Sequence, residues 1–304
     1  MNRVQNTTFL EKLKKRKSPS LKVEAVYLNS KLEIETIDYL KKQKYLNFLK
    51  IDVFLKNNFS KDHPFGYVLK NSFNGIVGFL GTMFSSQTNN NKDYILCNLH
   101  TWIVDKSYRL NSYLLIVPLM EIKCAITTYT PVKTLIGLYE KLGFKKINTN
   151  YRIVFLINLF GFLKKKMFII EENESLIKNY LNKNDMKIHN DHAHLSCKKF
   201  LLIDKLNPSN ACFIIAVKKK IKYLNTLDLV YVSNNLLLKK YWLNLCMQIA
   251  LKFRVSFCSQ SFLDENECSI PNNILISKEL TKEICVKNLP SEFKFNSLYS
   301  EFVY

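Results

Sequence analysis

The chain has 304 residues, of which 47% are hydrophobic, so it is long enough and apolar enough to bury one core or two. Its 21 Phe and 16 Tyr exclude a disordered polycation despite a formal net charge of +20. Only 5 of the 45 basic residues are Arg, which argues against sequence-specific DNA binding. The abundance of Lys, Asn and Ile is also typical of AT-rich coding, which would raise the charge without a polyanionic partner.

The cysteines and the apolar runs bear on the compartment. The eight cysteines show no C-x-x-C spacing and most lie in apolar stretches, which indicates buried thiols of a reducing cytoplasm. The first 20 residues have no apolar stretch that a secretion signal would need, and the most apolar run, 153–163, is too short to cross a bilayer. The sequence therefore predicts a soluble, cytoplasmic protein without a membrane span.

In the first half, strand and helix patterns alternate. A hairpin turn is expected at 71–75 and a polar loop at 86–93. Pro131 opens the last of the helices, and Gly143 ends it in a left-handed cap. The expected strands are 21–28, 65–70, 75–86, 94–104, 125–130, 144–151 and 152–159, and the expected helices are 33–56, 110–123 and 132–143.

A compositional break follows Gly161, because the chain has no glycine after it. In the second half, strands are expected at 211–220, 226–233, 254–260 and 297–304, and a long helix at 234–253. The succession strand, strand, turn, helix, strand repeats that of 75–130, so either an internal duplication or a merely similar α/β layer is expected. The boundaries that follow are a basic extension over 1–20, a first domain over 21–160, a linker over 161–175 and a second domain over 176–304.

A short polar turn follows the strand 94–104 and precedes a helix. A helix N-terminus exposes unpaired N–H groups and the positive end of the helix dipole, so such a turn can hold an anion. The turn reads Arg-Leu-Asn-Ser-Tyr-Leu over 109–114. It resembles the pyrophosphate loop of the GNAT-type acyl-CoA N-acyltransferases, in which Arg or Gln is followed by two residues, Gly, one residue and Gly or Ala. Arg109 matches the first position, whereas Ser112 and Leu114 replace the two small residues.

A second stretch resembles the same family. In "LYEKLGFKKI" (138–147), a tyrosine precedes a Gly-Phe pair that ends a helix. Tyr139 and Leu142 are expected on one helical face, with Phe144 buried at the start of the next strand. The resemblance implies that Tyr139 protonates the departing thiolate, and the alternative is that Tyr139 only packs.

The resemblance covers about residues 20–160 and implies a fold and a chemistry. The fold would be α/β, with two GNAT-like modules, each a mixed, mainly antiparallel sheet flanked by helices; the second would be degenerate, would not bind CoA and would shape the acceptor site. Acetyl-CoA or another acyl-CoA would be the co-substrate, and no metal is expected. The implied acyl-CoA-binding residues are Ile103, Val104, Arg109, Leu110, Asn111, Ser112, Tyr113 and Leu114.

The acceptor would be the amine of a small metabolite such as an amino sugar or an amino acid. Its deprotonation needs a base, and His100, expected on one strand face with Trp102 and Val104, is the candidate; the alternative is a structural histidine.

Two other functions stay open. A tandem transferase using aminoacyl-tRNA would place RNA phosphates on the positive surface, and a non-catalytic protein would keep the fold without the cofactor. The His-rich segment His189, His192, His194 and Cys197 lacks a second ligand pair and is interpreted as polar loop, not as a metal site.

Overall fold

A computed structural model describes residues 20–43, 59–89, 92–156, 167–221, 223–271, 277–290 and 297–300. The chain divides into two compact units. Among the described residues, unit 1 holds 20–147, 283–290 and 299–300, and unit 2 holds 148–282 and 297–298. The division falls inside one strand, between residues 147 and 148, earlier in the chain than the expected linker.

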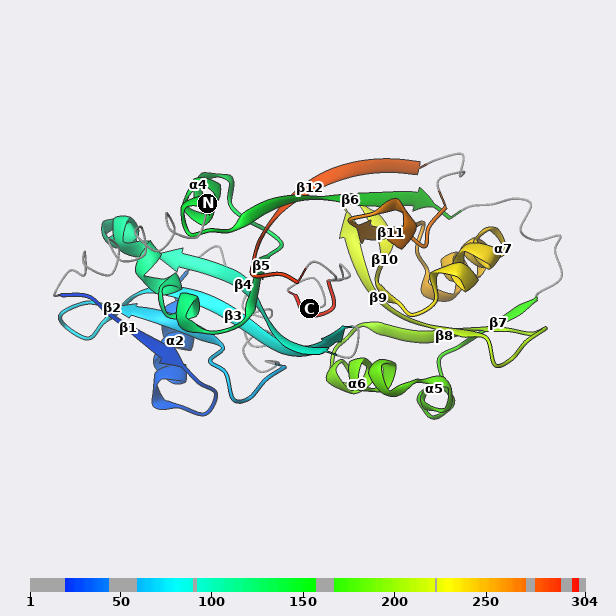
Figure 1. The fold of residues 1–304 in the computed structure, drawn as a ribbon, viewed down its shortest axis with the longest axis horizontal. Helices are drawn as coiled ribbons and strands as arrows, with labels where there is room; N and C mark the ends of the chain where they lie inside the picture. The colour runs from blue at the N-terminus through cyan, green and yellow to red at the C-terminus, as the bar shows by residue number, and fades with distance from the viewer. Residues whose placement is uncertain are drawn as a thin grey trace. The chain divides into compact units, whose positions relative to one another are not determined.

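Unit 1 is built on a mixed sheet with the strand order β1-β2-β3-β4-β5-β12, to which β12 contributes its last residues (Figure 1). All neighbours in this order are antiparallel except β4 and β5, which are parallel. The elements are β1 (Lys22–Val26), α2 (Lys31–Lys41), β2 (Gly66–Lys70), β3 (Ile76–Asn89), β4 (Lys92–Val104), the 3₁₀ helices η1 (Lys106–Ile116) and η2 (Pro118–Glu121), β5 (Ala125–Thr128), η3 (Lys133–Leu135), α4 (Ile136–Lys141), the first residues of β6 (Lys145–Phe155) and the end of β12 (Ser277–Lys287).

The two faces of this sheet bury different clusters, because side chains alternate between the faces along each strand. Val68 packs with α2 on one face, whereas its neighbours Tyr67 and Leu69 pack with η1, η2 and α4 on the other. α2 begins at Ser30, whose side chain accepts a hydrogen bond from the Glu33 N–H. Unit 1 therefore has two layers of helix around one sheet.

Unit 2 has the strand order β6-β11-β10-β9-β8-β7, in which β10 and β11 are parallel and the other neighbours are antiparallel. The helix α7 covers one face with a large apolar cluster centred on Trp242. Its elements beyond β6 are β7 (Phe168–Glu171), α5 (Glu174–Tyr180), α6 (Lys183–Asp191), β8 (Lys198–Asp204), β9 (Ala211–Ile221), β10 (Leu224–Val232), α7 (Asn235–Phe253), β11 (Phe257–Phe262), η5 (Glu265–Glu267) and the start of β12.

The two units repeat one succession of elements. In unit 1 the hairpin β3–β4 is followed by η1 and η2 and then by β5, parallel to β4. In unit 2 the hairpin β9–β10 is followed by α7 and then by β11, parallel to β10. Each hairpin also carries one register shift, at Leu80/Gly81 opposite β4 and at Leu229/Tyr231 in β10. The expected α/β class and the repeated order of elements are therefore present.

Several predicted elements were wrong in detail. The helix expected at 110–123 is a pair of 3₁₀ helices beginning at Lys106, and the two strands expected over 144–159 are the single strand β6. Residues 297–300, expected in a final strand, form a turn, and the expected polar loop at 86–93 is largely strand. The helix expected at 33–56 is seen as α2, and its part at 44–58 lies outside the described residues. The sequence analysis did not anticipate β7, α5, α6, β8 or β12.

Candidate active site

The pairing between β4 and β5 is much shorter than β4 itself. β4 pairs with β5 only from Leu96 to Asn98, although it continues along β3 to Val104. β5 pairs on its other side with β12, so it remains part of the sheet. In the part of the chain that is described, the last six residues of β4 therefore have one strand edge without a strand partner.

The free edge of β4 offers backbone N–H groups from alternate residues. The Asp105 N–H donates to the Val77 carbonyl of β3. Since neighbouring residues of a strand direct their N–H groups to opposite sides, the N–H of Val104 and of Trp102 faces the free edge, and that of Ile103 faces β3. Of the two residues expected to bind the cofactor through this strand, Val104 is the one that the register turns outward.

A β-bulge at Thr101 separates His100 from Trp102. Thr101 has a positive φ of 48°, and the register passes from Gly81↔His100 to Leu80↔Trp102 with Thr101 as the extra residue. Because Gly81 and Leu80 are adjacent in β3, their partners point to opposite faces. The expectation that His100 shares a face with Trp102 and Val104 was therefore wrong, and the bulge is the physical reason.

His100 is enclosed on its own face. Its side chain is 8% exposed, and its Nδ1 lies 3.0 Å from the Thr101 Oγ1. The ring packs over Gly81, where an added Cβ would lie 2.3 Å from the imidazole. Burial lowers the pKa of His100 to about 4, so the ring is neutral at pH 7. These surroundings favour a structural role for His100 over a role as the catalytic base.

Tyr139 lies at the end of α4, where the chain turns back to the sheet. Gly143 has φ 84°, its N–H donates to Glu140, and the Phe144 N–H donates to the Tyr139 carbonyl. This is a Schellman cap, and the rings of Tyr139 and Phe144, 5.1 Å apart, make the apolar contact that accompanies it. The predicted left-handed cap at Gly143 is confirmed.

The same tyrosine contacts the free segment of β4. Tyr139 is 3% exposed, and its ring meets Trp102 edge-on at a centroid distance of 5.7 Å. The Trp102 Nε1–H is buried without a hydrogen-bond partner in the described part of the chain. The structure thus brings together one predicted residue, Tyr139, and one that the sequence analysis mentioned only as a neighbour, Trp102.

The predicted phosphate turn lies inside a helix. Arg109 is the fourth residue of η1, and residues 109–114 belong to a 3₁₀ helix, in which N–H groups bond the carbonyl three residues earlier. Within the resolved part of unit 1, the Tyr108 N–H already bonds Asp105, which leaves the N–H groups of Lys106 and Ser107 as the outward-facing donors of the helix start. The position of the donors therefore differs from that expected, because η1 begins before Arg109.

The six side chains of this stretch have different environments. Arg109 and Leu110 are exposed, the latter 92%, while Leu114 is buried in the apolar cluster of unit 1 and does not cover the helix start. The three between them are half-buried: Asn111, Ser112 and Tyr113.

Asp105 and Tyr39 were missed by the sequence analysis. Asp105 occupies the N-cap of η1, but its Oδ1 accepts a hydrogen bond from the Tyr39 hydroxyl of α2 at 2.8 Å. The contact joins α2 to the end of β4. The preference of Asp for N-cap positions could have marked Asp105, whereas no local signal pairs it with a residue 66 positions away.

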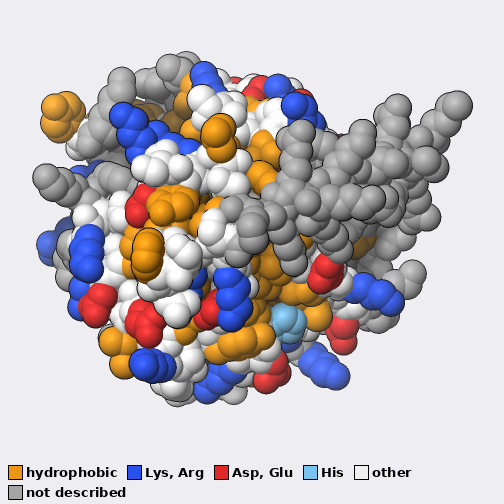
Figure 2. Space-filling view, turned by 90° about the vertical axis from the view of Figure 1, so that its left-hand side faces the viewer, with side chains coloured by type: hydrophobic (Ala, Val, Ile, Leu, Met, Phe, Trp, Pro, Cys, Tyr) orange, Lys and Arg blue, Asp and Glu red, His pale blue; other side chains and the backbone are white. Residues whose placement is uncertain are grey.

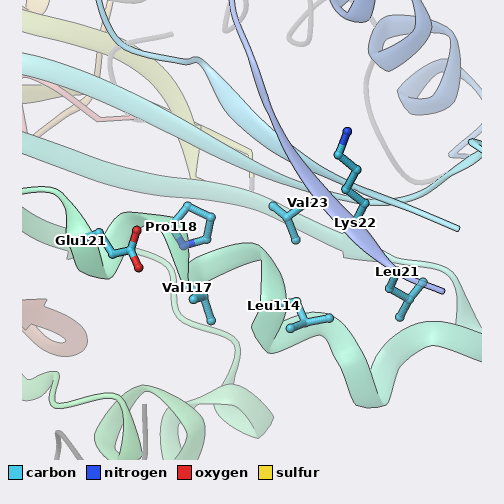
Figure 3. A pocket seen from close by; sticks show the side chains of 7 residues that line it. All are labelled: Leu21, Lys22, Val23, Leu114, Val117, Pro118 and Glu121. Atoms are coloured by element: carbon cyan, nitrogen blue, oxygen red, sulfur yellow. The ribbon is translucent and has the colours of Figure 1, made fainter. Parts of the chain in front are cut away.

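A cavity of about 590 Å³ lies in unit 1 between β1 and the helices η1 and η2 (Figure 3). Leu114, Val117, Pro118 and Glu121 come from the helices, and β1 passes alongside. Its lining is mainly apolar, with Lys22 and Glu121 as the charged members. Leu114 is the one predicted cofactor-binding residue that lines it.

The His-rich segment lies at the end of α6. His189 is in the last turn of this helix, and the two ring nitrogens of His192, its C-cap, lie 2.7 Å from the Ile188 carbonyl and 2.9 Å from the Leu298 carbonyl. No group of three or more His, Cys, Asp or Glu side chains suited to a metal occurs among the residues described. Segment 189–197, expected as loop, is partly helical.

No helix in the resolved ranges combines the length and the apolar character needed to cross a membrane.

Comparisons with known proteins relate this chain through its fold. No protein-family model and no curated protein matches the sequence. A GCN5-related N-acetyltransferase from Anabaena variabilis superimposes with a TM-score of 0.59 and 10% identity, covering 88% of this chain and 72% of that chain. A GCN5-related N-acetyltransferase from Kribbella flavida gives 0.58 and 9%, covering 88% and 70%. A probable N-acyltransferase from Enterococcus faecalis gives 0.55 and 10%, covering 88% and 72%.

These likenesses extend over most of the chain, although the sequences have diverged to about a tenth identity. Unit 1 has a mixed sheet in which β4 and β5 are parallel and β4 carries a β-bulge. The chain has the fold of the GCN5-related N-acetyltransferases.

Proposed function

We propose that this protein is an acyl-CoA-dependent N-acyltransferase that moves an acyl group, acetyl in the simplest case, onto the amine of a small metabolite such as an amino sugar or an amino acid. The short pairing of β4 with β5, which ends at Asn98, supports this proposal. Beyond Asn98, backbone N–H groups of β4 lie at a strand edge without a partner strand among the described residues, in a fold shared with N-acetyltransferases. Fold alone does not determine function, so we infer the function from this strand edge and from the groups beside it.

The donor substrate would bind along the free edge of β4. Its pantetheine arm can pair with the backbone of Trp102 and Val104 as an added strand would. Its diphosphate would meet the N–H groups of Lys106 and Ser107 at the start of η1. Residues three apart lie on one face of a 3₁₀ helix, so the side chains of Lys106 and Arg109 reach the same anion. Residues 110–114 would complete the site.

The reaction is a direct acyl transfer. The neutral amine forms a bond to the thioester carbonyl carbon, the carbon–sulfur bond breaks, and the thiolate takes the proton of Tyr139. A backbone N–H at the free edge of β4 would stabilise the developing oxyanion by about 3 kcal/mol. The amine proton passes to water, since His100 is enclosed on the opposite face, and Tyr139 regains a proton from water.

The proposal is tested by calorimetry with acetyl-CoA and by chromatographic detection of released CoA with a panel of amines. Chromatography is preferable to a thiol dye, because the protein has eight cysteines of its own. We expect saturable binding that the Arg109→Ala variant weakens about tenfold or more, the effect of losing a charged hydrogen bond. The exposed Lys145→Ala is the matched control and should bind as wild type. Absence of binding at high micromolar acetyl-CoA, with Arg109→Ala unchanged, would remove the proposal.

A further inference from the structure

A second cavity, of about 200 Å³, lies in unit 2 at the end of β10. Its walls come from the α5–α6 junction, from the start of β9 and from Ser233 and Asn234, which connect β10 to α7. We call it the unit 2 cavity. In the repeated succession of elements, its place corresponds to the end of β4 and the start of η1, where the donor site of unit 1 is proposed.

A buried carboxylate forms one wall of this cavity. Asp185 is 5% exposed; its Oδ1 accepts a hydrogen bond from the Tyr231 hydroxyl at 2.5 Å and its Oδ2 one from the Asn182 amide at 2.8 Å. A carboxylate has about four acceptor positions, so two remain. Within the described ranges no Lys, Arg or His lies within ion-pair distance of it.

This carboxylate lies in the first turn of α6 and caps it together with Asn182, but among the described residues it has no lysine beside it, unlike the other buried carboxylates of unit 2. Asp228 and Asp204 are similarly buried, and each has a lysine within 2.8 Å. Burial raises the pKa of Asp185, which a cation beside it would reverse. A buried charge is stable when it is paired and hydrogen-bonded. Asp185 has the hydrogen bonds, and the cavity in front of it has room for the missing cation.

Ser233 and Asn234, which also line the cavity, lie at the start of α7, where the electrostatic character is positive. α7 is 19 residues long and has no acidic residue in its first turn, so the positive end of its dipole is uncompensated there. The Asn234 side chain caps the Leu237 N–H, which leaves the N–H groups of Asn235 and Leu236 without a hydrogen-bond partner among the described residues. Such a helix start favours a carboxylate or another anion.

The size of the cavity restricts the ligand. A volume of about 200 Å³ corresponds to roughly seven water molecules at about 30 Å³ each. It therefore suits a ligand of about seven non-hydrogen atoms better than a nucleotide or a diphosphate with its pantetheine arm. The buried carboxylate also repels a diphosphate.

We propose that the unit 2 cavity binds a free α-amino acid with a small side chain, with the ammonium group against Asp185 and the carboxylate against the start of α7. The cavity thus lies where unit 1 has its proposed donor site, but it would bind a zwitterion. The inference stands on unit 2 alone and does not depend on acyl transfer by unit 1.

Calorimetric titration with glycine, L-alanine and L-serine tests the proposal, with N-acetyl-L-alanine and L-alaninamide as probes that lack one charge each. We expect saturable binding of at least one free amino acid and a loss of about tenfold or more with each of the two derivatives. The Asp185→Asn variant keeps the shape and the acceptor for Tyr231, and should lose binding by a similar factor. Asp191→Asn, on the same helix but paired with Lys187, is the control and should bind as wild type.

Ala211→Leu provides a second variant, because Ala211 lines the cavity and is not a hydrogen-bond partner of Asp185. It should abolish binding while thermal unfolding confirms a folded protein. Equal binding of L-alanine and N-acetyl-L-alanine, or no saturable binding of any free amino acid up to about 10 mM, overturns the inference. Acetyl-CoA binding measured on Asp185→Asn separates the two proposals, since it should be retained whichever way the amino-acid titration ends.

Discussion

Single side chains around β4 have roles that their spacing in the sequence does not reveal. His100 and Trp102 are two residues apart, but the bulge at Thr101 places them on opposite faces of the sheet. His100 is enclosed over Gly81, whereas Trp102 meets Tyr139 beside the free strand edge. Under the proposed function, Tyr139 is therefore the candidate for acid–base work in this site.

Removing the hydroxyl of Tyr139 tests this assignment. Tyr139→Phe keeps the ring contacts with Trp102 and Phe144, so the fold should be unchanged. We expect kcat to fall by about 10²-fold, the usual contribution of a general acid, with KM nearly constant. Tyr27→Phe, half-exposed on unit 1, is the control. If kcat stayed at the wild-type level, Tyr139 would have a packing role only.

His100 makes folding stability depend on pH. Its pKa in the folded protein, about 4, is lower than the ordinary value near 6.5, so the unfolded chain binds more protons between these two pH values. The stabilising contribution is complete above about pH 6.5 and is lost as the pH falls toward 4, by up to about 3 kcal/mol.

Urea denaturation at pH 7.5 and at pH 5 measures this loss. Burial lowers the pKa of His189 and His192 as well, so the wild type loses stability through all three. His100→Gln should lose less between the two pH values than wild type does. An identical loss in both proteins would show that His100 is protonated in the folded state.

Among the elements, α4 shows how a short helix is ended and positioned. Its Schellman cap depends on the left-handed conformation of Gly143, which places Tyr139 and Phe144 in contact. The 3₁₀ form of η1 has a different origin: Asn, Ser and Tyr are weak helix formers, and Pro118 cannot donate a backbone hydrogen bond. The conformational preferences of neighbouring residues thus account for the end of α4 and for the 3₁₀ form of η1.

Two glycines of the same region form a matched pair. Gly143→Ala should lower the free energy of unfolding by about 1–2 kcal/mol, because an L side chain is strained at φ 84°. Gly137→Ala, within α4, should raise it by up to about 1 kcal/mol, since nothing lies within 4 Å of the added Cβ. Chemical denaturation measures both. Equal effects of the two substitutions would contradict the assigned cap.

For the molecule as a whole, the charges on the surface and the buried charges have different roles. The net charge is +20, yet on the face shown in Figure 2 the basic side chains are spread among acidic and apolar ones and form no single patch. A buried charge contributes to the fold of unit 2: Arg152 of β6 is only 1% exposed. Its guanidinium pairs with Glu265 and Glu279, donates to the Ile270 carbonyl at 2.6 Å and lies over the Phe262 ring.

Replacing Arg152 should therefore destabilise unit 2 strongly. Arg152→Met removes the hydrogen bond to the buried Ile270 carbonyl and the pairs with two half-exposed carboxylates, and we expect a loss of about 2 kcal/mol in urea denaturation. Arg152→Lys keeps the charge without the fork and should lose less. The exposed Arg254→Met serves as control. A loss below about 0.5 kcal/mol for Arg152→Met, the range of surface pairs, would contradict this role.

The sequence by itself determined the features that depend on neighbouring residues. The left-handed end at Gly143, the α7 pattern and most strands of the first half follow from backbone preference and side-chain period. The resemblance of 109–114 and 138–147 also indicated the fold that the structural comparisons show.

Only the tertiary structure decided how far β4 pairs with β5, where β12 adds its strand, on which face His100 lies and that Asp185 has no cation beside it among the described residues. Each of these depends on groups far apart in the chain: Lys287 pairs with Ile126, and Tyr231 meets Asp185. Strand register and burial are set by such distant contacts, whose energies no local pattern of residues contains.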